Sequence, residues 1–247
     1  MAAALAALSL LPLAMVLARR PAGMPEATLL AAIGDVQAGE RMELYQIPIF
    51  PARWPVGVPL TLAEGKRIGV LPEGYSYYTT IVPAPDGGRI LFDRVFPDSG
   101  GIDLVLREPD GRIRRLTEAP GDDFGPAWAP DGSAIVFGTA RWTPHGDEDS
   151  DIAILDLATG EIRQLTAGPD SDGHPAWSPD GTRAAFTRLD ASSGLRTICW
   201  VTVDGSWEQC TPPSYPSYRD PRELSWTDSR RLRFQSSGDS DGALLSE

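Results

Sequence analysis

The chain has 247 residues, of which 42% are hydrophobic and 23% are charged, and its formal net charge is −12. The apolar content indicates a folded core rather than disorder, and the negative charge argues against nucleic acid or an anionic membrane surface as a partner, because both attract clustered Lys and Arg. The 25 Gly and 23 Pro are typical of many short strands joined by tight turns.

The N-terminal segment 1–20 differs from the rest of the chain. Residues 1–18 are almost wholly apolar, and Arg19 and Arg20 follow them. This length matches the apolar region of a secretory signal peptide and falls short of the ~20 residues of a spanning helix. We therefore expect an exported, periplasmic or extracytoplasmic protein with a signal peptide at 1–20. The alternatives are a membrane anchor at 1–18, which is the only membrane contact expected, or the stub of a longer chain.

The next segment, 21–42, is expected to be a linker with room for a short helix, and 43–247 to form one repeat domain. Trp128, Trp177 and Trp226 are spaced by 49 residues, and the first two stand in the phrase Pro-Ala-Trp-(Ala/Ser)-Pro-Asp-Gly. A period of about 40–50 residues indicates copies of one structural unit.

Each copy contains a turn and a large ring with separate structural roles. The Asp-Gly pair predicts a turn whose glycine takes a positive φ, and the tryptophan is expected to fill the space between neighbouring units. An earlier copy at 81–87 keeps the turn without the tryptophan. The positions assigned to the structural repeat are Asp86, Gly87, Trp128, Asp131, Gly132, Trp177, Asp180, Gly181 and Trp226.

Each unit reads as four short strands. In the copy at 124–166, apolar runs at 134–137, 152–155 and 161–166 follow the Trp128 phrase and are separated by turns or polar loops. Four strands joined in this way form an antiparallel meander, which is one blade of a β-propeller. Complete blades are expected at about 75–117, 124–166 and 173–211.

The two ends of the repeat domain each supply part of a blade. Residues 223–235 read as the first two strands of a blade, and 43–62 read as the last two. We expect these halves to complete one shared blade and close a four-bladed ring, which removes open sheet edges. The predicted fold class is therefore an all-β propeller of four-stranded antiparallel blades. The alternative is an open or partial ring, or a fragment that a partner chain completes.

The phrases at 175–182 (Pro-Ala-Trp-Ser-Pro-Asp-Gly-Thr) and 163–166 (Arg-Gln-Leu-Thr) resemble the TolB-type, WD-like propeller repeat. The resemblance covers about residues 75–236. It implies a non-catalytic scaffold of the cell envelope that docks a protein or peptide. The chain departs from that family in two respects, because it has no room for the α/β domain that precedes the TolB propeller and supplies fewer blades than usual.

The two cysteines lie on the arms of a hairpin around 203–206. If Asp204 and Gly205 form a two-residue loop, Cys199 and Cys210 lie directly opposite each other, and a disulfide can form. A three-residue loop with a bulge would instead turn the two side chains to opposite faces of the sheet. The sequence leaves both arrangements open.

The unusual loops are expected on one face of the propeller. In a four-stranded meander the loops after the second and fourth strands emerge together, and we call this side the loop face. The turns after the first and third strands form the opposite side, the hairpin face. The predicted binding face consists of the loop-face residues His145, Asp147, Asp149, Asp151, Asp170, Asp172, His174, Tyr215 and Tyr218.

Two kinds of ligand suit these side chains. Tyr215 and Tyr218 offer flat surfaces for a sugar ring or a peptide side chain. A divalent cation would be held by oxygen and imidazole ligands from the set His145, Asp147, Asp149, Asp151 and His174. The alternative is that these loops are solvated and only keep the protein soluble.

No catalytic residues are expected, because the sequence shows no Gly-x-Ser-x-Gly elbow, P-loop or Cys-His zinc pattern. No cofactor is expected other than the divalent cation considered above. The leading hypothesis is a non-catalytic scaffold that docks a protein or peptide on its acidic loop face. The alternative is the propeller part of a peptidase-type or glycan-active enzyme whose catalytic domain is absent from this chain.

Overall fold

The computed structural model describes residues 27–33, 43–49, 66–70, 80–96, 101–142, 149–212, 215–216, 221–236 and 244–246. Within these ranges every regular element is a β-strand. They include no helix that is long and apolar enough to span a membrane. The expected signal peptide or anchor at 1–20 lies outside the described residues. The chain divides into two compact units, Met1–Pro72 and Glu73–Glu247, and each is described by itself.

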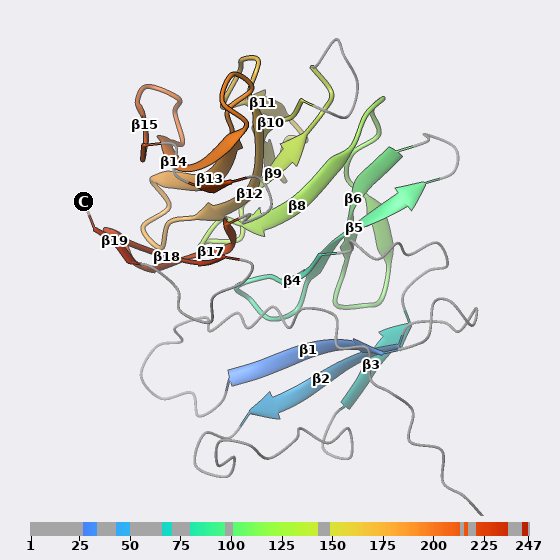
Figure 1. The fold of residues 1–247 in the computed structure, drawn as a ribbon. Helices are drawn as coiled ribbons and strands as arrows, with labels where there is room; N and C mark the ends of the chain where they lie inside the picture. The colour runs from blue at the N-terminus through green and yellow to red at the C-terminus, as the bar shows by residue number, and fades with distance from the viewer. Residues whose placement is uncertain are drawn as a thin grey trace, which may run out of the picture. The chain divides into compact units, whose positions relative to one another are not determined.

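The first unit contains one antiparallel sheet of β1 (Ala27–Ile33), β2 (Glu43–Ile49) and β3 (Lys66–Val70), in the order β1-β2-β3 (Figure 1). The segment expected to be a linker with room for a helix therefore contains a strand. Its sequence, Ala-Thr-Leu-Leu-Ala-Ala-Ile, is a short apolar run whose periodicity cannot separate helix from strand. Pairing with β2 along its whole length decides in favour of the strand.

The second unit contains four antiparallel sheets, which we number as blades 1 to 4. Blade 1 comprises β4 (Ile81–Pro83), β5 (Ile90–Phe96), β6 (Gly101–Arg107) and β7 (Ile113–Arg115). Blade 2 comprises β8 (Asp123–Trp128), β9 (Ala134–Thr139), β10 (Asp151–Asp156) and β11 (Ile162–Gln164). Blade 3 comprises β12 (Ser171–Trp177), β13 (Arg183–Leu189), β14 (Leu195–Thr202) and β15 (Glu208–Cys210), and β16 (Tyr215–Pro216) also pairs with β14. Blade 4 comprises β17 (Pro221–Asp228), β18 (Arg231–Ser236) and β19 (Leu244–Ser246).

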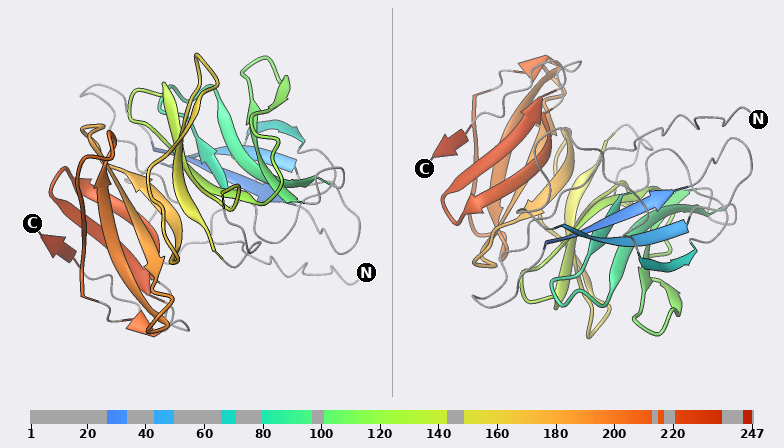
Figure 2. Two further views of the ribbon diagram at one scale, coloured as in Figure 1. Left: turned by 90° about the horizontal axis from the view of Figure 1, so that it is seen from above. Right: turned by 90° about the horizontal axis from the view of Figure 1, so that it is seen from below.

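The four blades lie side by side in chain order, and Figure 2 shows them running from green (blade 1) to red (blade 4). The three complete blades predicted from the repeat are confirmed, and each is a four-stranded antiparallel meander. The all-β class and the partial, open propeller are confirmed as well.

The shared blade is not formed by the residues that the structure describes. Strands β17, β18 and β19 pair with one another, and β1, β2 and β3 pair in a separate sheet, so Glu43–Ile49 and 223–235 do not build one blade together. The physical reason is that each of these strands pairs with strands close to it in the sequence. Blade 4 takes its third strand from Leu244–Ser246, and β2 finds its neighbours on both sides within its own unit.

The Pro-Asp-Gly phrases form the turns that the sequence predicts. The carboxylate in each phrase accepts a hydrogen bond from the backbone N–H two residues later, at 2.8 Å for Asp86, 2.9 Å for Asp131 and 3.0 Å for Asp180. The glycine directly after each aspartate takes a left-handed conformation, with φ of 72°, 72° and 76° at Gly87, Gly132 and Gly181. A side chain would be strained there, which explains the glycine.

The core lies between blades, and we call each interface a seam. Apolar residues of consecutive blades form the seams 1/2, 2/3 and 3/4. A phenylalanine in the second strand of each complete blade is fully buried, namely Phe92, Phe137 and Phe186. The repeated tryptophans also face the seams, because the indole Nε1 of Trp128 donates to the Val82 carbonyl at 3.0 Å and that of Trp226 to the Ala176 carbonyl at 3.1 Å. Both acceptors belong to the preceding blade, so the predicted position of these rings between blades is confirmed.

Candidate functional site

The loop-face ends of the blades hold carboxylate–arginine pairs rather than free acidic groups. Asp123 is fully buried at the start of β8 and accepts hydrogen bonds from Arg141 Nη2 and Thr139 Oγ1, both at 2.5 Å. Asp103, which is also fully buried, lies 2.5 Å from Arg115 Nη2. A buried ion that is paired and hydrogen-bonded holds its surroundings in one arrangement. These carboxylates therefore organise the loop face from inside.

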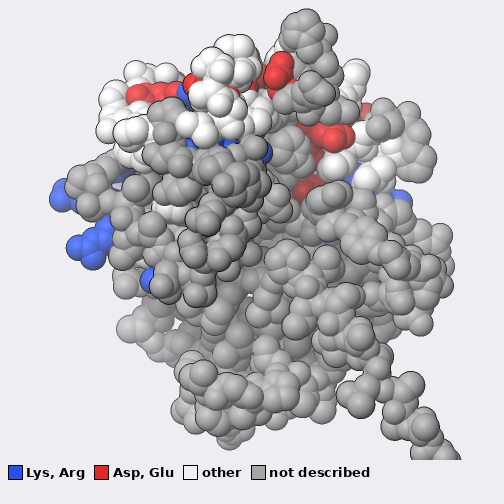
Figure 3. All heavy atoms as spheres, viewed as in Figure 1, with Lys and Arg blue, Asp and Glu red and all other residues white. Residues whose placement is uncertain are grey.

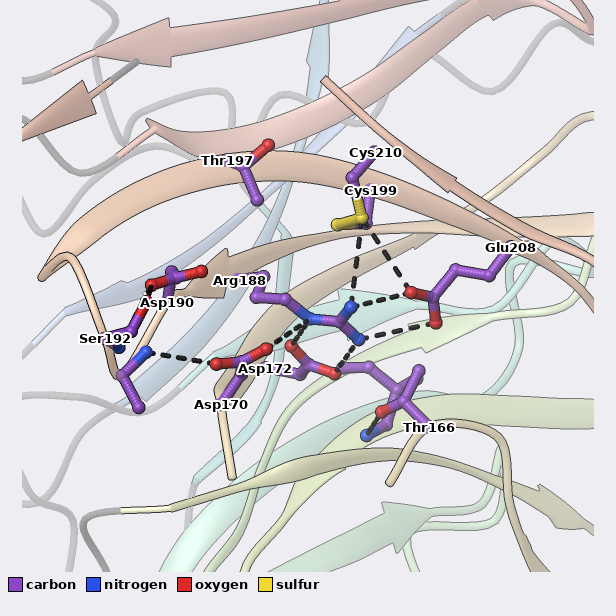
Figure 4. Close-up of polar contacts among 12 residues, drawn as sticks. Thr166, Asp170, Asp172, Arg188, Asp190, Ser192, Thr197, Cys199, Glu208 and Cys210 are labelled. Carbon is purple, nitrogen blue, oxygen red and sulfur yellow. Dashed lines mark hydrogen bonds and ion pairs between the residues drawn. A yellow bond between two sulfur atoms is a disulfide. The ribbon is translucent and has the colours of Figure 1, made fainter. Parts of the chain in front are cut away.

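The largest such network is centred on Arg188 in β13 (Figure 4). Its Nε and Nη2 bind the two oxygens of Asp172 at 2.7 and 2.8 Å, and its Nη1 lies 2.6 Å from Glu208. The Asp170 carboxylate is 3.9 Å away. These hydrogen bonds and charges raise the pKa of Arg188, so the guanidinium stays protonated. The guanidinium of Arg188 thus links the first, second and fourth strands of blade 3.

Burial changes the acidity of the carboxylates at this end of blades 2 and 3. Burial raises the pKa of Asp172 above its usual value, although the hydrogen bond from Arg188 opposes the change. Burial also raises the pKa of Asp151 to about 6, with a smaller contribution from the negative charge of Asp172, against a lowering by the hydrogen bond from Gln164 at 2.9 Å. Asp151 is only 4% exposed. It is therefore a buried acid close to a second one and not a free surface charge.

A threonine after the fourth strand of each complete blade closes the loop-face end. The Oγ1 atoms accept a hydrogen bond from the backbone N–H near the start of the third strand, at 2.9, 2.9 and 3.2 Å for Thr117, Thr166 and Thr211. The first two belong to the Leu-Thr pairs of the repeat. The Leu-Thr pair therefore recurs at a fixed place in the repeat because its threonine accepts a backbone N–H that would otherwise be left without a partner.

The disulfide between Cys199 and Cys210 is present, with the two residues directly paired across β14 and β15 and a Cα–Cα distance of 4.0 Å. The loop that joins these strands has four residues, 203–206, because the Thr202 N–H bonds the Trp207 carbonyl at 2.9 Å. A four-residue loop keeps the same alternation of faces as the two-residue loop considered above. The first of the two arrangements left open is thus the observed one. The bridge lies beside Arg188, whose Nη1 is 3.9 Å from Cys210 Sγ (Figure 4).

The predicted binding face divides into exposed and structural residues. Asp149 and Asp170 are half-exposed, whereas Asp151 and Asp172 are buried in the contacts described above. His174 was expected in a loop but lies within β12, where the register shifts between Gly173 and Ala176, and its φ is 51°. Tyr215 lies in β16 opposite Arg196. The remaining members, His145, Asp147 and Tyr218, are outside the described residues.

A cation site is not assembled from the predicted ligands in the ranges that the structure describes. The group of potential ligand atoms that comes together there is Cys199, Glu208 and Cys210. Because the two sulfurs are bonded to each other, they are not the thiolates that a metal requires. The carboxylate of Glu208 is taken up by Arg188.

Sequence reasoning missed an exposed aromatic residue on the loop face. Trp142, which follows β9, is 39% exposed, and the guanidinium of Arg141 lies 5.6 Å from its ring centre. An Arg-Trp pair directly after the second strand of a blade was the available signal. Large exposed rings are frequent among the residues that dominate protein interfaces.

The charged side chains are unevenly distributed over the described surface. In the view of Figure 3, acidic side chains gather along the upper edge, where Figure 1 draws the loops of blades 1 to 3. Basic side chains gather at the left, over β18 and β19, and the exposed arginines of this blade include Arg230, Arg231 and Arg233. Among the described residues, however, most of the exposed acidic side chains lie in the hairpin-face turns, among them Asp86, Asp131 and Asp180, whereas Asp149 and Asp170 of the loop face are half-exposed.

No protein-family model matches the chain, and no curated protein matches its sequence. Solved structures do resemble it. A structure described as a putative TolB from Agrobacterium tumefaciens is 21% identical, with a TM-score of 0.58 over 90% of this chain and 78% of that one. TolB from Acinetobacter baumannii is 15% identical, with a TM-score of 0.58 over 88% of this chain and 53% of that one. An oligogalacturonate lyase in complex with manganese is 18% identical, with a TM-score of 0.59 over 89% and 61%.

These likenesses show the fold. The resemblance of the repeats to TolB-type propellers is confirmed at that level, and the chain has a β-propeller fold like that of the TolB structures. It spans 53% and 61% of the lengths of two of these structures. Because the same fold occurs in TolB and in a lyase, the fold leaves the function to be argued from the surface.

Proposed function

We propose that the chain is a binding scaffold whose loop face docks a protein or peptide. The supporting observation is that its acidic side chains differ in burial and in pairing with arginine. Asp123 and Asp172 are buried and held by arginines, whereas Asp149 and Asp170 are half-exposed near the same ends of blades 2 and 3. The buried pairs fix the scaffold, and the half-exposed Asp149 and the exposed ring of Trp142 remain for a partner. The half-exposed Asp170 already accepts the Ala191 N–H at 3.0 Å and lies 3.9 Å from Arg188. Charge complementarity favours a basic partner with apolar side chains.

Peptide binding tests this proposal. We would titrate the full chain with three labelled peptides of equal length, one rich in Lys and Phe, one in Glu and Phe, and one in Ser and Phe. The lysine peptide is expected to bind best, and added salt should weaken it. Trp142→Ala and Asp149→Asn should each reduce its affinity. Asp131→Asn, a matched charge removal on the hairpin face, should leave the affinity unchanged. Equal loss in Asp131→Asn, or no preference for the lysine peptide, would contradict the proposal.

We further propose that the protein is exported. The Cys199–Cys210 disulfide supports an oxidising compartment, and the apolar segment 1–18 supports a signal peptide or an anchor. N-terminal sequencing of the protein from a bacterial expression host separates the two. A start near residue 19–21 indicates a cleaved signal, and an intact N-terminus in the membrane fraction indicates an anchor. An intact N-terminus in the cytoplasm would contradict export.

A second candidate is the propeller part of a glycan-active enzyme. The likeness to the oligogalacturonate lyase, with a TM-score of 0.59, favours it. Thermal unfolding with Mn²⁺ and with oligogalacturonate, each added alone and then together, tests this candidate. A ligand that binds the native state raises the melting temperature. A rise with the sugar would favour the enzyme over the scaffold, and an unchanged melting temperature would remove the support for it.

A further inference from the structure

The seams between blades are held by a repeated clamp that is present at two seams and missing at the third. At seam 1/2 the guanidinium of Arg89 lies 4.8 Å from the ring centre of Trp128, and its Nη2 donates to the Gly132 carbonyl at 3.0 Å. At seam 3/4 Arg183 stacks over Trp226 at 5.4 Å and donates to the Ser229 carbonyl. In both cases an arginine of one blade binds the tryptophan and the turn of the next.

The same two tryptophans reach back across the seam through their indole N–H groups, as described for Trp128 and Trp226. Each clamp therefore combines two hydrogen bonds in opposite directions with a cation–π contact. Such a contact contributes about 0.5–1 kcal/mol at exposed sites and more when it is shielded from water. The clamps lie at the hairpin-face end of the seams, next to the Pro-Asp-Gly turns.

Seam 2/3 lacks this clamp. The position of Arg89 and Arg183, directly before the second strand's apolar run, is occupied by Ala134 in blade 2. Trp177 packs against the apolar cluster of this seam, but its Nε1 is buried and makes no hydrogen bond within the described residues. A cross-blade hydrogen bond at this end comes from Arg163, an exposed side chain of the outer strand β11, to the Val203 carbonyl.

The loop-face end of seam 2/3 is tied more firmly than its hairpin end. Ser150, of blade 2, is 5% exposed and its Oγ donates to the Asp172 carbonyl at 2.7 Å. The Asp172 N–H donates in turn to the Ser150 carbonyl at 2.7 Å, and the Oγ atoms of Ser150 and Ser171 are 3.1 Å apart. This end of the seam thus combines a backbone hydrogen bond with a buried one from the Ser150 hydroxyl in the opposite direction, and such a pair is harder to break than an exposed side-chain contact.

We propose that the propeller has a hinge at seam 2/3. Blades 1 and 2 form one body and blades 3 and 4 a second, and the two pivot about Ser150, Ser171 and Asp172 while the hairpin-face end opens. A packed interface with an unclamped end is the kind of element that supports such rigid-body motion. Asp149 and Asp170 lie on opposite sides of this pivot, so a partner bound to both would hold the hinge at one angle. The hinge itself does not depend on that proposed partner.

Spin-label distances across each seam test the hinge on the full chain. Single cysteines introduced in pairs at the exposed residues Arg112, Glu161, Ser206 and Arg230 report on the three seams, because each lies on a different blade. The pair across seam 2/3 is expected to give a broader distance distribution than the pairs across seams 1/2 and 3/4. Three distributions of equal width would overturn the proposal.

Two substitutions that exchange the clamp make the test specific. Ala134→Arg supplies seam 2/3 with the missing arginine and is expected to narrow the 161/206 distribution while leaving the 112/161 pair unchanged. Arg183→Ala removes the clamp at seam 3/4 and is expected to broaden the 206/230 distribution. If Ala134→Arg does not fold, Arg183→Ala alone decides the matter. Unchanged widths in a folded variant would show that the clamp does not control the seam.

Discussion

At the scale of the residue, the repeated tryptophans differ in their polar contacts although they share one phrase. Trp128 and Trp226 each donate a hydrogen bond to the preceding blade, whereas the Nε1 of Trp177 has no hydrogen-bond partner among the residues that the structure describes. The sequence predicts the position of all three rings correctly. It cannot distinguish them, because the acceptor of each indole N–H is a backbone carbonyl of the preceding blade, which comes near the ring only after folding.

This difference predicts unequal costs for the same substitution. Trp128→Phe removes the hydrogen bond to the carbonyl of the half-buried Val82, which costs about 0.5–1.5 kcal/mol in addition to the loss of volume. Trp177→Phe removes an N–H that has no partner, so this additional cost is absent. Urea unfolding of both variants measures the difference, with Trp226→Phe as a second hydrogen-bonded case. Equal free energies of unfolding for Trp128→Phe and Trp177→Phe would contradict the assignment.

A second residue-scale feature is the buried carboxylate of Asp93 in β5, which is 3% exposed. It accepts hydrogen bonds from the Thr80 N–H at 2.6 Å and from the Gly125 N–H of blade 2 at 3.0 Å. Burial raises its pKa to about 6, although these two hydrogen bonds act in the opposite direction. The group therefore binds a proton more tightly in the folded than in the unfolded chain.

The sign of the resulting pH dependence follows from this shift. A group with a raised folded pKa contributes stability that is fully present below its unfolded pKa and is lost as the pH rises through about 6. Asp93→Asn should remove this contribution, up to about 3 kcal/mol between pH 4 and 7 at roughly 1.4 kcal/mol per pKa unit. Urea unfolding of both proteins across this range measures it. An identical slope in the variant would show that Asp93 does not titrate there.

At the scale of the element, the strands of the complete blades were predictable and the pairing at the chain ends was not. Alternating apolar runs and Asp-Gly turns locate β5, β9 and β13, because local sequence determines a short strand between two turns. The short apolar segments at Ala27–Ile33 and Leu244–Ser246 lie outside the repeated phrases, although an Asp-Gly pair stands just before the second, at 241–242. Their partners depend on which strand edge lies nearest in the folded chain, and a repeat pattern contains no information about that.

The residue types of the candidate site could be predicted from the sequence, but the burial and the pairing of their side chains could not. Acidic loops are visible in the sequence, yet the burial of Asp172 depends on Arg188, which lies directly opposite it across β12 and β13. A shift of one residue in that register would turn the carboxylate to the other face. The sequence left the formation of the disulfide undecided for the same reason. It depends on the loop length, which only the backbone pairing of Thr202 and Trp207 shows.

The disulfide allows a test at this scale. Replacing both Cys199 and Cys210 by Ala is expected to lower the free energy of unfolding by about 2–3 kcal/mol, because a cross-link over a short loop reduces the freedom of the unfolded chain. Urea unfolding measures the change. A reductant should bring the original protein close to the double variant and leave the variant unaffected. A variant as stable as the original would mean that the bridge adds no net stability.

At the scale of the whole molecule, two groups of carboxylates with opposite shifts set the pH of greatest stability. Burial raises the pKa of Asp93 and Asp151 to about 6, and it raises the pKa of Asp123 and Asp172 as well. In the turns, hydrogen bonds from nearby backbone or hydroxyl groups lower the pKa of Asp190 and Asp204 to about 2.

The first group loses its stabilising contribution as the pH rises toward 6, and the second loses its contribution as the pH falls toward 2. We therefore expect the free energy of unfolding to be greatest near pH 4 to 5 and to decline toward neutral pH. Urea midpoints measured at intervals from pH 3 to 8 test this expectation. A midpoint that rises steadily up to pH 7 would contradict it and would place the buried carboxylates in better-solvated surroundings.

The turn aspartates have a consequence for how the protein behaves in concentrated solution. In eight turns of the described part of the chain a carboxylate accepts a backbone N–H two residues ahead, at Asp86, Asp110, Asp131, Asp156, Asp180, Asp190, Asp204 and Asp228. An asparagine oxygen can accept the same bond. Exchanging all eight would change the formal charge from −12 to −4 while keeping each acceptor in place. Charge equal to two thirds of the formal net charge thus belongs to groups that reverse the direction of the chain, so the repulsion between copies of this molecule could be adjusted while every turn keeps its acceptor.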